Sequence, residues 1–309
     1  MPENDLLNPR RTIELDEGEL LDAPPRSPFV ELGVLSCFSF LRGASDAVDL
    51  VLTARALGYD AIGIADANTM AGVVRVHSEA ATVKLRPVIG CRIETVEGLV
   101  FLAYPTDRAA YGRLCRLISA GRMATLEGEW QAKGECDIDL DMLAAHAEGV
   151  QLILVPPRDL DRHFTIAAPS NVVPFVSRRE RGGKERREEV VPAGGASQHA
   201  DQVEPERLRR GPELSASSAP LRETFPKLLP HLTRQLPTLR HIAASYLHAG
   251  DDIARIEALD ALAKAHGLTI LATNDVHYHC PERRPLQDVM TAIRHKTTVA
   301  AAGHLLHGN

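Results

Sequence analysis

Short apolar runs alternate along most of the chain with segments of helical period. Residues 61–65 and 268–273 are largely apolar and have the length and composition expected of buried strands. In residues 45–57 and 251–265, apolar side chains recur every three or four positions, which is typical of helices that pack by one face. Because strand and helix alternate, the pattern predicts a mainly parallel α/β fold.

The same pattern predicts most of the remaining elements. We expect strands at residues 29–35, 61–65, 87–93, 99–104, 150–155, 241–246 and 268–273. We expect helices at residues 45–57, 70–83, 107–121, 139–146 and 251–265, with a further amphipathic helix after the turn at Pro281.

The centre of the chain lacks this periodicity. Residues 178–189 are a run of mixed charges, and stretches rich in Ala, Gly and Ser follow it. Such composition buries too little apolar area to offset the entropy of ordering. The predicted organisation is a flexible N-terminal arm (1–28), a first domain part (29–164), an irregular, disordered insertion (165–236), a last domain part (237–296) and a tail that looks cut short (297–309).

Composition narrows the class of protein. The net charge is −6, which argues against a domain that coats DNA, since phosphate binding needs a basic surface. The five cysteines are scattered and odd in number, as expected of structural thiols in a reducing compartment. The N-terminus does not resemble a signal peptide, and no apolar run approaches the roughly 18 residues of a membrane span. We therefore expect a cytoplasmic protein with no membrane partner.

Metal-capable side chains follow two of the predicted strands. Asp275, His277 and His279 come directly after strand 268–273, and Asp66 follows strand 61–65. Ligands bind beyond the carboxyl ends of strands in α/β sheets, so this is where chemistry is usually located. The alternative is structural: Asp275 and His277 hydrogen-bond their own loop, and Asp66 caps the helix that begins near Met70.

Other charged side chains fit simpler roles. We expect His77 and His279 to be surface or loop histidines. The basic helix face of Arg283, Arg284 and Arg294 fits a solvated surface or an interdomain contact better than a DNA site.

Several separated motifs resemble one family. The sequence is similar to the polymerase-and-histidinol-phosphatase (PHP) domain of bacterial C-family replicative polymerases, and within these to the error-prone, damage-inducible branch. The resemblance covers about residues 28–160 and 237–309. The stretches that carry it are Phe38–Ser45, Gly58–Asp66, Ala103–Leu117, Lys133–Cys136, Ala272–His279 and Arg283–Ile293.

The resemblance implies a distorted (βα)7-type PHP barrel with its metal site at the carboxyl ends of the strands. In active members, His, Asp and Glu side chains bind divalent metals that hydrolyse phosphoesters. Four positions that match family ligands carry other residues here. They are Gly33, Leu35, Ala67 and Arg92, with Glu94 on a different phase of the same strand.

The ligand positions that the resemblance leaves intact are Asp66, Asp275 and His277. We therefore expect a degenerate site with no assigned catalytic residue and no cofactor beyond residual binding of Mn²⁺, Zn²⁺ or Mg²⁺. The resemblance implies that the chain is the PHP domain of an error-prone polymerase involved in DNA repair and translesion synthesis. We expect no polymerase activity and no direct DNA binding from it alone.

Two alternatives stay open: a stand-alone metal-dependent phosphoesterase, and a non-functional remnant of a truncated or frame-disrupted gene. The partners implied are the remaining polymerase domains and the accessory proteins of error-prone repair.

Overall fold

The computed structural model describes residues 27–166 and 221–306. The chain divides into two units, residues 1–165 with 222–309, and residues 166–221. Only the two end residues of the second unit, Ile166 and Leu221, are described.

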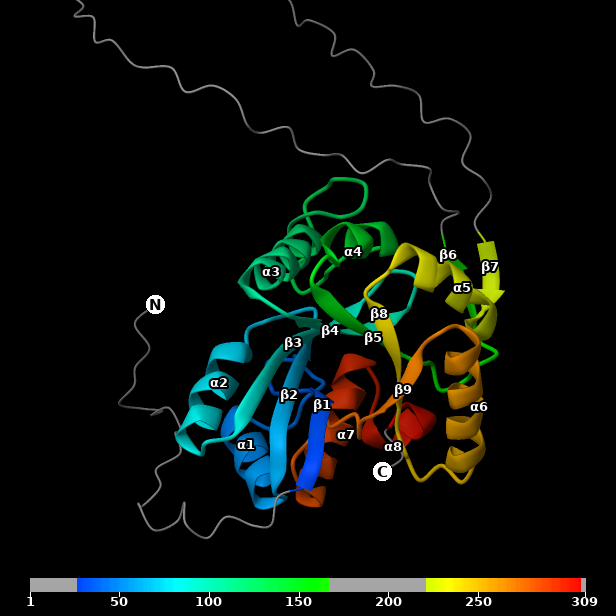
Figure 1. Cartoon of the computed structure of the whole chain (residues 1–309). Coiled ribbons are helices and arrows are strands. Elements are labelled where there is room, and N and C mark those ends of the chain that lie inside the picture. Colours follow the sequence, from blue (N-terminus) through cyan, green and yellow to red (C-terminus); the bar gives the residue numbers. More distant parts are fainter. Residues whose placement is uncertain (1–26, 167–220, 307–309) are drawn as a thin grey trace, which may run out of the picture. The chain divides into compact units, whose positions relative to one another are not determined.

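Seven strands form the main sheet, in the order β1-β2-β3-β4-β5-β8-β9 (Figure 1). Neighbouring strands are parallel except at β4, which runs antiparallel to both β3 and β5. A separate two-stranded sheet contains β6 and β7. The strands are β1 (Ser27–Val34), β2 (Tyr59–Ala67), β3 (Arg86–Glu94), β4 (Val100–Pro105), β5 (Val150–Val155), β6 (His163–Ile166), β7 (Leu221–Thr224), β8 (Leu239–Ala244) and β9 (Thr269–Ala272).

Helices connect most of these strands. Asp46, Asp107 and Asp139 each accept a hydrogen bond from a backbone amide in the first turn of α1, α3 and α4. The helices are α1 (Ala47–Ala56), α2 (Val73–Thr82), α3 (Arg108–Met123), α4 (Leu140–His146), α5 (Phe225–Gln235), α6 (Asp252–Ala265), α7 (Arg284–Arg294) and α8 (Val299–Ala302), with short 3₁₀ turns η1 (Pro281–Arg283) and η2 (Gly303–Leu305). In the described part of the chain, no helix has the length and apolar character needed to span a bilayer.

The main sheet is curled, and the fold class predicted from the sequence is confirmed. Apolar side chains from all seven strands meet in one core on its concave face. The Gly33 amide of β1 donates to the Tyr104 hydroxyl of β4 at 2.8 Å, although two strands separate β1 from β4. The residues of this concave core are Leu32, Ala65, Val88, Leu102, Tyr104, Ile153, Val155, Ala243 and Leu271.

A second core joins the outer face of β1 and β2 to α1 and α2. Val51 of α1 and Val76 of α2 are completely buried there, together with Ile64 of β2. Figure 1 shows α1 and α2 beside β1–β3, and α6 beside β8 and β9. Helices outside and apolar side chains inside are the layers expected of a curled α/β sheet.

Side chains join the two edge strands at one end of the sheet. Glu31 of β1 is buried and accepts hydrogen bonds from the Thr273 hydroxyl at 2.7 Å and the Asn274 amide at 2.9 Å, just beyond β9. The Leu35 amide donates to the Val276 carbonyl at 2.9 Å. These contacts fasten the start of the sheet to its last strand.

The predicted domain boundaries differ from the structure in two places. The end of the predicted insertion, 165–236, contains β7 and α5, and α5 buries Phe225, Leu228 and Leu232 at helical spacing. Its charge run and most of its length lie outside the described residues. The predicted tail contains α8 and η2, in which Ala302 is buried. Residues 1–26 of the predicted N-terminal arm also lie outside the described residues, and β1 begins at Ser27.

Candidate functional site

The site predicted from sequence lies at the carboxyl ends of β1, β2, β3 and β9. Two of the positions matched to family ligands lie at the end of β1. Gly33 has a φ of +83°, and a Cβ atom there would lie 3.0 Å from the Leu102 side chain. Leu35 is buried. Both positions therefore contribute to apolar packing.

Asp66 lies at the end of β2, where polar groups of the loop after β1 surround it. Its carboxylate accepts hydrogen bonds from the Ser36 amide and hydroxyl, each at 2.8 Å, and from the Ser39 hydroxyl at 2.6 Å. Burial raises the pKa of the Asp66 carboxyl, although these hydrogen bonds oppose the rise. The predicted cap is wrong: α2 begins at Val73, and its N-cap is Gly72, which makes no side-chain hydrogen bond.

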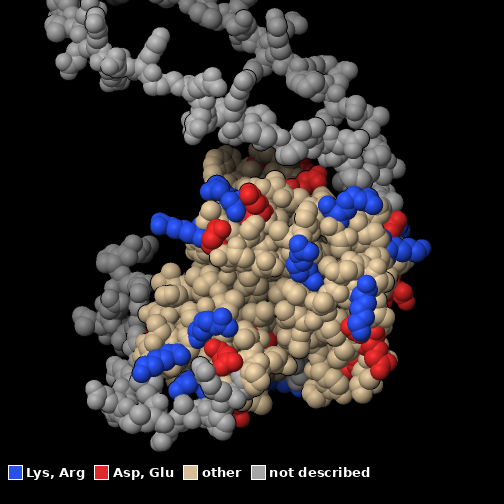
Figure 2. Space-filling model, in the orientation of Figure 1, with Lys and Arg blue, Asp and Glu red and all other residues tan. Residues whose placement is uncertain are grey.

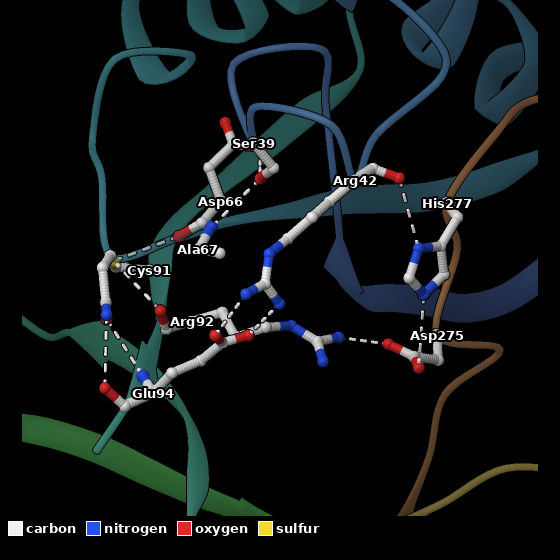
Figure 3. Close-up of polar contacts among 10 residues, drawn as sticks. Ser39, Arg42, Asp66, Ala67, Cys91, Arg92, Glu94, Asp275 and His277 are labelled. Carbon is white, nitrogen blue, oxygen red and sulfur yellow. Dashed lines mark hydrogen bonds and ion pairs between the residues drawn. The ribbon is translucent and has the colours of Figure 1, made fainter. Parts of the chain in front are cut away.

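Arg92, at the end of β3, forms an ion pair with Asp275, as Figure 3 shows. The other carboxylate oxygen of Asp275 lies 3.6 Å from Nε2 of His277, whose Nδ1 lies 3.4 Å from the Arg42 carbonyl. Burial disfavours the charged Asp275 carboxylate, but the Arg92 guanidinium and His277 outweigh it and hold the pKa well below its usual range. Asp275 and His277 are thus brought together, with a cation beside them.

A second arginine lies next to this pair. Arg42 binds both carboxylate oxygens of Glu94, with Nη2 at 2.7 Å from Oε2. The Asn68 side chain holds the backbone of Glu94, accepting from its amide at 2.9 Å. Arg294 of α7 lies close enough that burial and Arg42 both lower its pKa, while Glu94 opposes them. The ends of β3 and α7 therefore gather three guanidiniums and two carboxylates.

The two other histidines considered from the sequence, His77 and His279, are not part of this ion-pair cluster. His279 Nδ1 lies 2.8 Å from the Ser45 hydroxyl and 4.0 Å from an Asp49 oxygen. His77 is exposed, as predicted for a surface histidine. Within residues 27–166 and 221–306, no three or more His, Cys, Asp or Glu side chains form a group suited to a metal ion.

A cavity of about 420 Å³ adjoins Asp275 and His277 at the ends of β5, β8 and β9. Arg158, Arg255 and His304 are among its lining residues. Arg255 is held in place by the carbonyls of Pro157 and Arg158, each at 2.7 Å from a guanidinium nitrogen. Sequence reasoning missed these residues. Arg158 follows β5, so the rule that pointed to Asp275 points to it as well.

Comparison with known proteins identifies similar sequences. The PHP domain family model matches residues 31–179. Among curated proteins it is related to error-prone DNA polymerases. It is 35% identical to that of Caulobacter vibrioides over 285 residues and 38% identical to that of Rhodopseudomonas palustris (strain HaA2) over 288 residues. The resemblance derived from the motifs is therefore confirmed.

The alignments cover nearly all of this chain but only a small part of each relative. Each spans 91% of this chain but only 20% of the Caulobacter protein and 23% of the Rhodopseudomonas protein. The chain thus spans about a fifth of the length of the curated relatives it matches. A solved structure described as a metal-dependent phosphoesterase from Bifidobacterium adolescentis aligns with 82% of this chain, at 16% identity and a TM-score of 0.46.

Proposed function

We propose that this chain is a non-hydrolytic PHP module of an error-prone DNA polymerase system, in which ion pairs replace the metal site. The observation that carries the proposal is the Arg92 guanidinium bound to Asp275. In this function the module is a structural and interaction domain for a polymerase that copies damaged DNA during repair. Its partners are the other polymerase domains and the accessory proteins of error-prone repair.

The donor set of the site does not fit a divalent metal. A metal ligand must offer lone pairs to the ion, and Asp275 already offers one oxygen to Arg92. A dication at this carboxylate would lie beside a fixed guanidinium charge and be repelled by it. The Asp66 carboxylate already accepts hydrogen bonds from Ser36 and Ser39, so it does not offer its oxygens to an ion beside Asp275. No hydrolytic step is therefore assigned to these residues.

The charge balance at the site supports the same conclusion. Where the family resemblance implies a glutamate ligand, Arg92 supplies a positive charge, and Arg42 supplies another nearby on Glu94. A metal brings positive charge to converging carboxylates, and here the two arginines bring it instead. The loops after β1, β3 and β9 are thereby tied together without an ion.

A stand-alone phosphoesterase is the second candidate, and the cavity beside Asp275 is the observation that favours it. Arg158 and Arg255 give that cavity a basic lining, and a phosphate group carries the opposite charge. This candidate requires Asp275 and His277 to bind an activating metal at the cavity wall.

One assay separates the two candidates. The purified chain is incubated with Mn²⁺ or Zn²⁺ and p-nitrophenyl phosphate, and its melting temperature is measured with and without metal and EDTA. We expect no turnover above the metal blank and no metal-dependent shift of the melt. Turnover that disappears in Asp275→Asn or His277→Ala would refute the non-hydrolytic function. A chain that lacks any cooperative melt would instead support the non-functional remnant.

A further inference from the structure

Helix α7 exposes its apolar side. Leu286, Val289 and Ile293 recur at helical spacing and are 42%, 44% and 56% exposed, whereas Gln287 and Thr291 are buried. An amphipathic helix at the surface of a domain normally directs its apolar stripe inward. The orientation of α7 is the reverse of that expectation.

Charged groups lie near both ends of α7. Arg294 lies near Arg42 and Glu94, and Arg283 just before the helix lies 3.5 Å from an Asp49 oxygen. These groups do not satisfy the buried polar side chains between them. The Gln287 amide and the Thr291 hydroxyl have no hydrogen-bond partner among the described residues, so this orientation leaves buried polar groups unsatisfied.

A groove continues the exposed stripe toward the loop after β1. It has a volume of about 360 Å³ and is lined by Phe40, Cys37, Leu286 and Met290, among others. Phe40 is 82% exposed. We call Phe40, Leu286, Val289, Met290 and Ile293 the α7 surface. Contiguous apolar groups that flank a groove mark an interaction site more often than single exposed side chains do.

Charges around the α7 surface restrict its occupant. Arg284 begins α7 and Lys296 follows its end, and both are exposed. A second copy docked antiparallel on α7 would bring Arg284 against the partner's basic end, which is unfavourable. Asp46 and Asp49 line the groove together with Arg283, so the fitting partner has an apolar centre with charged groups of both signs at its rim. The face drawn in Figure 2 likewise carries Lys and Arg near Asp and Glu.

We propose that the α7 surface binds the polymerase part that the relatives carry beyond this domain. Those relatives contain the homologue of this chain in about a fifth of their length, so the domain occurs joined to a much larger polypeptide. An apolar helix face that this domain leaves uncovered is then an interdomain contact. This inference rests on the proposed function and names the surface through which the module acts.

A matched pair of substitutions tests the proposal. Val289→Asp alters the α7 surface, and Val74→Asp is the control, because Val74 is 77% exposed on α2. In this chain both variants should melt within about 2 °C of the unchanged protein, as expected for exposed positions. The aligned substitutions are then made in the full-length Caulobacter vibrioides error-prone polymerase. There the one aligned with Val289 should raise the rate of limited proteolysis by about tenfold, because it places a charge in a contact, whereas the control should not.

Three outcomes would overturn the proposal. Equal proteolysis of the two full-length variants would show that the α7 surface is uncovered in the polymerase. A large drop in melting temperature for Val289→Asp in this chain alone would show that this chain covers the stripe itself. Light scattering that finds a dimer, dissociated by Val289→Asp, would assign the surface to a second copy. Phosphoester turnover would refute the proposed function and leave all three measurements unchanged.

Discussion

Asp66 and Asp275 both occupy positions that match metal ligands of the family, and the structure places them in opposite surroundings. Neutral donors from Ser36 and Ser39 hold Asp66, and burial raises its pKa. A guanidinium holds Asp275, and its pKa is lowered. The cost of burial is thus offset in different ways at two carboxylates that lie at the ends of strands of the same sheet. One is solvated by hydroxyl and amide groups, and the other is neutralised by a fixed charge.

The largest effect should come from removing the charge beside Asp275. Arg92→Met keeps most of the apolar length of the side chain but leaves a largely buried carboxylate without its cation, which should cost about 3 kcal/mol of unfolding free energy. Urea denaturation measures this change. The double variant Arg92→Met with Asp275→Asn is the control, and it should recover part of the loss because the unpaired charge is gone. Additive losses in the double variant would show that the two residues do not interact.

Asp66 and Asp275 should also differ in the sign of their pH dependence. Because the pKa of Asp66 is raised in the folded state, its contribution to stability is fully present below the unfolded pKa and is lost as pH rises through the folded pKa. The lowered pKa of Asp275 makes its contribution present above the unfolded pKa and lost as pH falls.

Measured between about pH 3 and pH 7, the unchanged protein should therefore lose stability relative to Asp66→Asn as pH rises. Over the same range it should gain stability relative to Asp275→Asn. Denaturation curves at each pH provide the comparison, and the two differences should change in opposite directions. Parallel curves for the two variants would contradict the assigned surroundings.

The smallest effect should come from the second arginine. The Arg42 and Glu94 side chains are 32% and 26% exposed, so solvent screens their pairing more than that of Arg92. Arg42→Gln should cost about 1 kcal/mol, and the cost should fall in high salt. Lys264→Gln, which removes the exposed helical pair with Asp260, is the matched control and should change stability by less than about 0.5 kcal/mol. If salt does not reduce the stability lost in Arg42→Gln, then the Arg42 side chain stabilises the fold by packing and not by its charge.

Local pattern predicted much of this fold. The period of apolar residues located all seven strands of the main sheet, because buried strands and one-sided helices leave separate signatures. It missed α5, since Pro226 and Pro230 and the neighbouring charged segment obscured the spacing of Phe225, Leu228 and Leu232. It predicted an amphipathic helix after Pro281, but not that α7 would expose the apolar side of that helix.

The sequence predicted which residues lie at the site, but not which of them form ion pairs or hydrogen bonds with one another. Residue types identified Asp275 and His277, and the family resemblance identified Arg92, yet the ion pair of Arg92 with Asp275 joins positions 183 residues apart and depends on how the sheet curls. The hydrogen bonds of Asp66 come from a loop 27 to 30 residues earlier, whose path no local rule specifies. The Arg42–Glu94 pair was missed for the same reason.

The hydrogen bonds that join Glu31 of β1 to Thr273 and Asn274 after β9 have a consequence for synthesis of the protein on the ribosome. The Glu31 carboxylate meets a hydroxyl 242 residues later in the chain. A nascent chain therefore lacks the hydrogen bonds to the Glu31 carboxylate until Thr273 and Asn274 have emerged, and closing so long a loop is slow. A buried carboxylate without its hydrogen-bond donors is costly, so the end of β1 stays incompletely held until then. The domain should thus need a chaperone most during elongation, and least once Thr273 and Asn274 have left the exit tunnel.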